Sequence, residues 1–241
     1  MIQKVFYFPQ IFPIFQEAHD FFVNTKKQTA TQHLFTNKQL RTLLVPIMVE
    51  QLLSSLMGTA DTMMVSNVGS AAISAVSLVD AINILVIQAL SALAAGGAIL
   101  CSQYLGSQNL KKAKRSAEQV LFVMLVLSCS LSLLCLIFRF PLLRLIFGTV
   151  DTDVMANSQI YFFFTLLSFP FIGLYDAGAS ILRAQNNTKG PMTISILSNF
   201  LNIGGNAILI FVFGMGVAGA AISTLVSRIF CAIVVIWQLR N

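Results

Sequence analysis

Five ionisable side chains lie inside long apolar stretches of this sequence, where charged groups are rare. They are Glu50, Asp61, Asp80, Asp176 and Arg228. A charge in such a stretch is costly to bury, and it usually faces a protein interior or a wet cavity. These positions are therefore the first candidates for ion exchange or ligand binding.

Uncharged polar residues accompany some of these charges. Asn202 and Asn206 are four residues apart and share one face of a helix. If the apolar stretches are membrane helices and the N-terminus lies inside the cell, a rise of about 1.5 Å per helical residue converts sequence position into depth. One set of residues then falls at a similar depth, in the outer half of the membrane: Asp61, Asp80, Asn206 and Thr224. A carboxylate, two amide oxygens and a hydroxyl can hold a small cation such as Na⁺, or the carboxylate can exchange protons. The alternative is a network of polar side chains that packs helices together.

The same depth estimate places a second set of residues nearer the inner surface of the membrane: Glu50, Asp176 and Arg228. Acids and a base at one depth predict an inner ionic cluster. The alternative is that Arg228 extends its charged end toward the inner surface and that Asp176 lies among lipid headgroups.

The segments that carry these residues are membrane helices by composition. Of the 241 residues, 56% are apolar and 10% are charged, and the mean hydropathy is +0.81. A crossing helix needs about 20 mainly apolar residues. Six windows fit, at roughly 43–65, 72–93, 120–138, 158–181, 192–213 and 217–239, with the last two separated by Gly214-Met215-Gly216. Because no window alternates polar and apolar residues, we expect an all-α, six-helix membrane bundle.

Basic residues set the expected orientation. With the N-terminus inside, all but three of the fifteen Lys and Arg residues fall on the inner side. Arg139 and Arg144 fall outside, and Arg228 lies within the sixth segment. The net charge of +6 is thus a topological signal that needs no nucleic-acid partner.

Residues 1–40 differ from the rest, because prolines interrupt an aromatic-rich start that a polar stretch follows. We expect a cytoplasmic or interfacial extension here. No glycine-rich loop ends in Gly-Lys-Ser/Thr, and no nucleophile, base and orienting acid occur together. The sequence therefore predicts neither an enzyme, nor a cofactor, nor a structural metal site.

The order and spacing of four motifs resemble the multidrug and toxic compound extrusion (MATE) transporters. The motifs are VPIMVEQLLSSLMGTADTMMVSNVG, ALAAGGAILCSQYLGSQNLKKA, ILRAQNNTKGPM and LNIGGNAILIFVFGMGVAGAAISTLVS. Together they extend the resemblance from about Leu34 to the end of the chain. The resemblance implies export of organic, often cationic, molecules in exchange for H⁺ or Na⁺ across a bacterial plasma membrane.

The resemblance also assigns residues. Asp61 matches the first-helix aspartate that serves cation coupling, and Asn202, Asn206 and Thr224 fall on the other positions of that site, which Na⁺ would occupy. Asp80 is a further acid for the cavity. Where some members carry a second aspartate, this chain has Asn206, so the site holds one negative charge fewer.

Family members have two six-helix lobes, and this sequence corresponds to the amino-terminal lobe alone. We expect it to act with a carboxy-terminal lobe or as a homodimer, surrounded by membrane lipid. The alternatives are a truncated, non-transporting or structural fragment and, among transporters, a lipid-linked oligosaccharide flippase. A flippase favours a more basic cavity, whereas acids outnumber bases at membrane depth here.

The topology can be tested with single cysteines introduced into a cysteine-free background. A cysteine at Ser70 should react with an impermeant maleimide in intact cells, because the loop after the first helix is predicted outside. A cysteine at Gln108 should react only after permeabilisation. The reverse labelling pattern would overturn the predicted orientation.

Overall fold

The chain between residues 37 and 240 is almost entirely helical. The computed structural model describes residues 37–148 and 150–240. Its helices are α2 (Asn37–Val65), α3 (Ser70–Gly106), α4 (Leu110–Ile137), α5 (Arg139–Phe147), α6 (Thr152–Ala184), α7 (Lys189–Asn206), the π-helical η1 (Ala207–Val212) and α8 (Gly216–Arg240). Counting α7 with η1 as one span, six spans of the described chain are long and apolar enough to cross a membrane. This result confirms the all-α, six-helix fold class.

Most helices extend beyond the apolar windows that the sequence marks. The second helix continues from the predicted end near residue 93 to Gly106, and the third begins at Leu110 instead of near residue 120. Polar residues at a helix end still form backbone hydrogen bonds, although they add nothing to an apolar window. Residues 37–40, predicted as part of the extension, begin α2, and residues 1–36 lie outside the described residues.

Two short segments connect the membrane helices in ways that the sequence predicts only in part. Gly214 and Gly216 have φ of 63° and 55°, which non-glycine residues rarely adopt, and they form the predicted turn before α8. The short helix α5 was not predicted, because nine residues are too few to mark an apolar crossing. It carries both of the basic residues that the sequence assigns to the outside.

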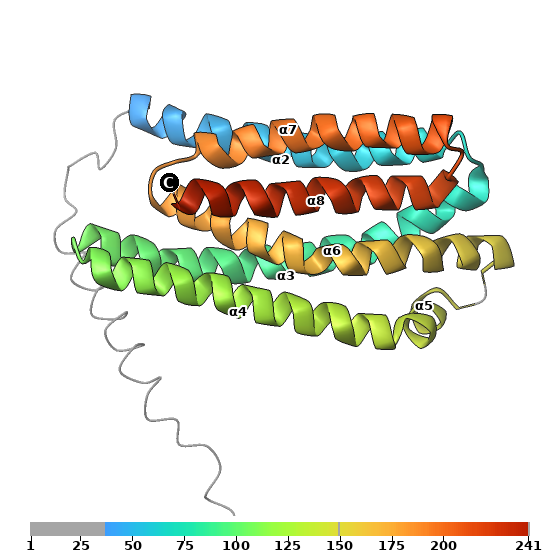
Figure 1. The fold of residues 1–241 in the computed structure, drawn as a ribbon, viewed down its shortest axis with the longest axis horizontal. Coiled ribbons are helices and arrows are strands. Elements are labelled where there is room, and N and C mark those ends of the chain that lie inside the picture. The colour runs from blue at the N-terminus through green and yellow to red at the C-terminus, as the bar shows by residue number, and fades with distance from the viewer. Residues whose placement is uncertain (1–36, 149, 241) are drawn as a thin grey trace, which may run out of the picture. The chain divides into compact units, whose positions relative to one another are not determined.

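Helices α6 and α8 form the centre of the bundle. Half of the apolar window of each is buried, and α8 runs between α6 and α7 in Figure 1. The largest core cluster joins α3, α6 and α8 and includes Val76, Val79, Phe162, Leu166, Phe169 and Ala220. This packed centre positions the polar residues on α6 and α8.

Glycines allow close approach at several helix interfaces. A Cβ on Gly173 of α6 would lie 2.7 Å from Oγ of Ser128 on α4, and one on Gly178 would lie 2.7 Å from Val235 of α8. On α7, a Cβ on Gly205 would overlap the Ser223 side chain of α8. Small residues at membrane-helix interfaces allow backbones to approach closely, and here they bring α7 onto α8.

Helix α2 is attached to the bundle differently. Only 11% of its apolar window is buried, against 50% for α6 and α8. Its buried residues are Pro46, Glu50, Asp61 and Val65, and two of these four are carboxylates. Hydrogen bonds and charge therefore contribute far more to the attachment of α2 than to that of the central helices.

The contact between α7 and α8 gives a matched pair of substitutions. Gly205→Ala should lower the free energy of unfolding by about 1–3 kcal/mol, because the methyl group displaces a serine hydroxyl from the helix interface. Gly204→Ala is the control, since a Cβ there meets nothing within 4 Å. Thermal unfolding in detergent, followed by circular dichroism, should show a lower midpoint for Gly205→Ala alone. Equal midpoints would contradict the close approach.

Candidate functional site

Asp61 forms the centre of a hydrogen-bonded network between three helices. It is 4% exposed. Its Oδ1 accepts a hydrogen bond from Nδ2 of Asn206 on α7, and its Oδ2 accepts one from the Thr224 hydroxyl on α8 at 3.2 Å. Nδ2 of Asn202 donates to Oγ1 of Thr224, also at 3.2 Å. The structure thus brings together the four residues that the sequence analysis assigned to one site.

Local structure aligns the donors in this network. Asn202 and Asn206 are one helical turn apart, and both side chains are fully buried. Ser223 of α8 donates its hydroxyl to the backbone oxygen of Asn202 at 2.7 Å, which fixes α7 against α8. The α-helix ends at Asn206, and the wider π-helical turns of η1 follow at once. Such turns often occur at functional sites.

The Oδ1 atom of Asn206 is buried and has no hydrogen-bond partner in the described part of the chain. The amide nitrogen of the Asn206 side chain faces the carboxylate of Asp61. An ionised carboxylate only accepts hydrogen bonds, so it needs such a donor beside it. An unpartnered acceptor beside a buried acid can accept a hydrogen bond from a protonated carboxyl group, or it can coordinate a small cation. The network therefore has the chemistry for cation exchange.

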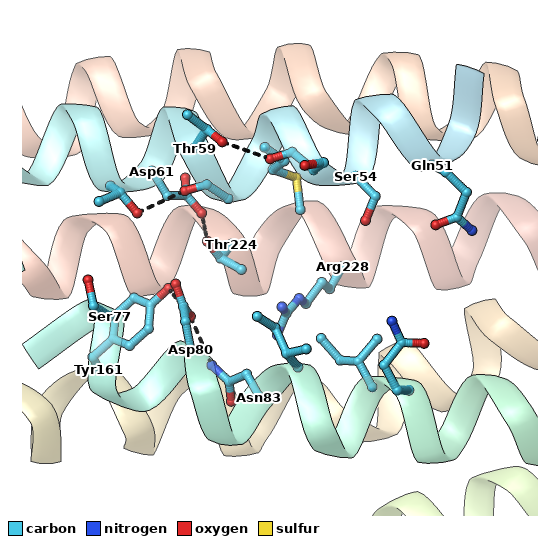
Figure 2. A pocket seen from close by; sticks show the side chains of 17 residues that line it. Gln51, Ser54, Thr59, Asp61, Ser77, Asp80, Asn83, Tyr161, Thr224 and Arg228 are labelled. Atoms are coloured by element: carbon cyan, nitrogen blue, oxygen red, sulfur yellow. Dashed lines mark hydrogen bonds between the residues drawn. The ribbon is translucent and has the colours of Figure 1, made fainter. Parts of the chain in front are cut away.

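A cavity of about 680 Å³ opens beside this network. Asp61 and Thr224 line it together with residues of α2, α3 and α6, as Figure 2 shows. Asp80 of α3 lines the same cavity, and its Oδ1 accepts hydrogen bonds at 3.2 Å from both Asn83 and the Tyr161 hydroxyl. The cavity therefore has two carboxylates on its walls, including the further acid that the sequence suggested.

Arg228, predicted in an inner cluster with Glu50 and Asp176, lies within electrostatic range of Asp176 and also lines the cavity of the outer acids. Its Nη1 atom donates to Oγ of Ser168 at 2.6 Å, and its side chain lines the cavity of Asp61 and Asp80. Depth along a helix does not specify the direction in which a side chain points. Arg228 lies one turn after Thr224 on α8, so it shares the cavity-facing side of that helix.

Glu50 pairs with a residue that lies just beyond the predicted fourth apolar window, 158–181. Arg183, in the last turn of α6, forms an ion pair with Oε1 of Glu50 at 2.9 Å. The Tyr175 hydroxyl donates to the same oxygen at 2.9 Å and contacts Ser195 of α7 at 3.0 Å. The structure thus links α2 to α6 and α7 at its other buried carboxylate.

Asp176 lies within electrostatic range of Arg183, Glu50 and Arg228. Its Oδ2 atom is buried and has no hydrogen-bond partner among the described residues. Arg183 is thus the base that pairs directly with Glu50, and Asp176 interacts with both arginines over a longer range.

Several site residues were missing from the sequence analysis. Asn83 follows Asp80 by three residues, a spacing that places both on one helix face and offers a signal. Tyr161, Tyr175 and Ser168 offer none, because aromatic and hydroxyl residues are common in apolar segments. Their roles arise only from contacts with residues 60 to 125 positions away.

The chain matches the MatE family model over residues 46–208. It is 33% identical over 196 residues to the uncharacterized transporter YisQ of Bacillus subtilis, an alignment that covers 79% of this chain and 42% of YisQ. It is 28% identical over 198 residues to the probable multidrug resistance protein NorM of Thermotoga maritima, again covering 79% of this chain and 42% of the relative. The chain therefore spans less than half the length of these relatives.

Solved structures also match most of this chain over less than half of their own length. A MOP superfamily transporter from Pyrococcus furiosus has a TM-score of 0.78 and 26% identity, covering 84% of this chain and 44% of that one. The outward-facing conformation of a multidrug resistance MATE family transporter gives the same four values. The six helices thus correspond to a single lobe of these structures.

Proposed function

Because this chain belongs to the MatE family, we propose that it is one lobe of an exporter that exchanges a cation for organic molecules. The observation that carries the proposal is the position of Asp61. It is buried, hydrogen-bonded to two other helices, and part of the wall of a cavity large enough for a small organic molecule. One carboxylate can thus respond both to a coupling ion and to a substrate.

The substrates in this proposal are organic molecules that carry a positive charge. Two acids, Asp61 and Asp80, line the cavity against one base, Arg228. Carboxylates on a cavity wall attract cations, whereas the pyrophosphate group of a lipid-linked sugar requires an excess of bases. This balance favours drug export over the flippase alternative.

The coupling ion in this proposal is the proton. The site around Asp61 supplies one negative charge, so Na⁺ would depend largely on neutral oxygens. In the arrangement described above, the nearest amide presents its nitrogen to the carboxylate, and it would have to turn over to coordinate a metal ion. A proton needs only the carboxylate itself, without that rotation and without further oxygen ligands.

Protonation then acts on α2. Neutralising Asp61 weakens the charge-assisted hydrogen bonds that it accepts from α7 and α8. Because α2 has little apolar packing, it can shift relative to α7 and α8 and change access to the cavity. A bound organic cation favours the ionised carboxylate and therefore opposes protonation, so the proton and the organic cation exchange for one another.

The lobe works with a second six-helix lobe in this proposal, because it spans about 44% of the structures it resembles. A second copy of the chain is the alternative partner. We place the protein in the plasma membrane of a bacterium with its N-terminus inside, as its basic residues predict.

Ethidium efflux tests the proposal in bacterial cells that lack their own exporters of this dye. Cells that express the chain together with a carboxy-terminal MatE lobe should export ethidium, and Asp61→Asn should abolish export because it removes the exchangeable carboxylate. Asp153→Asn is the matched control, since this acid is exposed at the start of α6. Immunoblots of membranes should show equal amounts of each variant.

Normal efflux by Asp61→Asn would contradict the assignment of the coupling residue. Absence of efflux by the unmodified chain, alone and with the second lobe, would favour the non-transporting fragment.

A further inference from the structure

A second cavity, of about 670 Å³, lies where α3, α6 and α8 end and α4 begins. Figure 1 shows these helix ends together at one end of the bundle, the end that the basic residues predict as cytoplasmic. This cavity shares no lining residue with the cavity of Asp61. The proposed exchange therefore leaves it without a role.

The deep part of this second cavity is apolar. Leu121 of α4 and Leu174 of α6 line it, and each lies about 15 Å along the helix axis from the nearer end of its helix. Apolar side chains continue the wall toward the helix ends: Leu105, Ile181, Ile236 and Leu239. A hydrocarbon chain gains contact along such a wall without leaving a polar group unpaired.

The outer rim of the same cavity is basic. Lys114 of α4 and Arg240 of α8 line it close to the ends of their helices, and both are exposed. Glu118 is the one acid among the described lining residues. Within the described chain, none of these three side chains forms an ion pair. The rim thus carries two bases against one acid, and its charges are available to a bound molecule.

We propose that this cavity binds an anionic phospholipid of the inner leaflet, with its phosphate group toward Lys114 and Arg240 and one acyl chain along the apolar wall. The occupant must combine a negative headgroup with a hydrocarbon chain, because the basic rim and the apolar depth belong to one cavity. Basic pockets between membrane helices on the cytoplasmic side suit anionic headgroups. This site is separate from the exchange site and does not depend on its function.

The acid on the rim narrows the choice of headgroup. The hydroxyl groups of phosphatidylglycerol can donate to Glu118 while its phosphate faces the two bases. Phosphatidylethanolamine can also donate to Glu118 through its ammonium group, but it has no net charge to balance the rim. Phosphatidylcholine has no N–H or O–H donor and no net charge. We therefore expect the affinity to fall in the order phosphatidylglycerol, phosphatidylethanolamine, phosphatidylcholine.

Trp237 provides a probe for this site within the chain itself. It is the one tryptophan of the sequence, it is 63% exposed, and it follows Ile236 of the cavity wall. In mixed lipid nanodiscs, brominated phosphatidylglycerol should quench its fluorescence at an about tenfold lower mole fraction than brominated phosphatidylcholine, because only the former gains net attraction to the rim. Brominated phosphatidylethanolamine should fall between them. The comparison uses the unmodified chain, so it does not depend on the folding of a variant.

Substitutions then test the two parts of the site. The pair Lys114→Gln and Arg240→Gln, combined in one chain, should remove the preference for phosphatidylglycerol. The pair Lys111→Gln and Arg115→Gln is the matched control, because it removes the same two charge types from α4 outside the cavity lining, and the preference should remain. Ala117→Phe places a ring in the cavity with all charges unchanged, and it should also remove the preference. Circular dichroism should show equal helix content in every variant.

Four results would overturn the proposal. Equal quenching by phosphatidylglycerol and phosphatidylcholine would make the contact that of any surrounding lipid, and equal quenching by phosphatidylglycerol and phosphatidylethanolamine would remove the need for an anion. A preference that persists without Lys114 and Arg240 would belong to the wider basic surface. One that persists in Ala117→Phe would mean that no acyl chain enters. Each of these results leaves the exporter function intact, because that function rests on the other cavity.

Discussion

The hydrogen bonds that Asp61 accepts from Asn206 and Thr224 connect α2 to the rest of the bundle. In lipid, an apolar helix face gains little by packing against another apolar face, so close van der Waals contact and polar bonds hold helices together. The centre of this bundle has such contact through its glycines, whereas α2 has little apolar packing beyond Val65. The attachment of α2 therefore depends on the charge state of a buried carboxylate.

The second carboxylate of α2 extends this arrangement along the helix. Glu50 pairs with Arg183 and Tyr175, about three turns before Asp61 on α2. In the proposed exchange, a pair with a permanently charged arginine keeps the attachment at Glu50 independent of the coupling ion. Asp61 has no base within ion-pair distance among the described residues, so its attachment is the one that protonation weakens. A helix with one constant and one switchable attachment can pivot, and such a pivot would link ion binding to the cavity.

Much of this arrangement could be predicted from the sequence, because hydropathy and helical spacing encode it. The length of the apolar windows predicted the six membrane crossings. The four-residue spacing of Asn202 and Asn206 predicted a polar helix face at the depth of Asp61. The facing direction of a side chain is not encoded in depth, so the sequence did not reveal that Arg228 lines the cavity of Asp61 and Asp80. The partners Tyr161 and Arg183 and the π-helical turn after Asn206 depend on packing between distant segments, and no local pattern specifies them.

The distance between α2 and α7, measured by electron spin resonance, tests the central claim most directly. Spin labels at Leu56 and Phe200, which are 59% and 74% exposed, would replace the side chains in a cysteine-free background. We predict one narrow distance distribution at neutral pH, and a broader, longer one both at acidic pH and in Asp61→Asn. Replacing Na⁺ by choline should leave the distribution unchanged. If the distance distribution is the same at acidic pH and in Asp61→Asn as at neutral pH, or if it changes with Na⁺ instead, the attachment of α2 is not controlled by protonation.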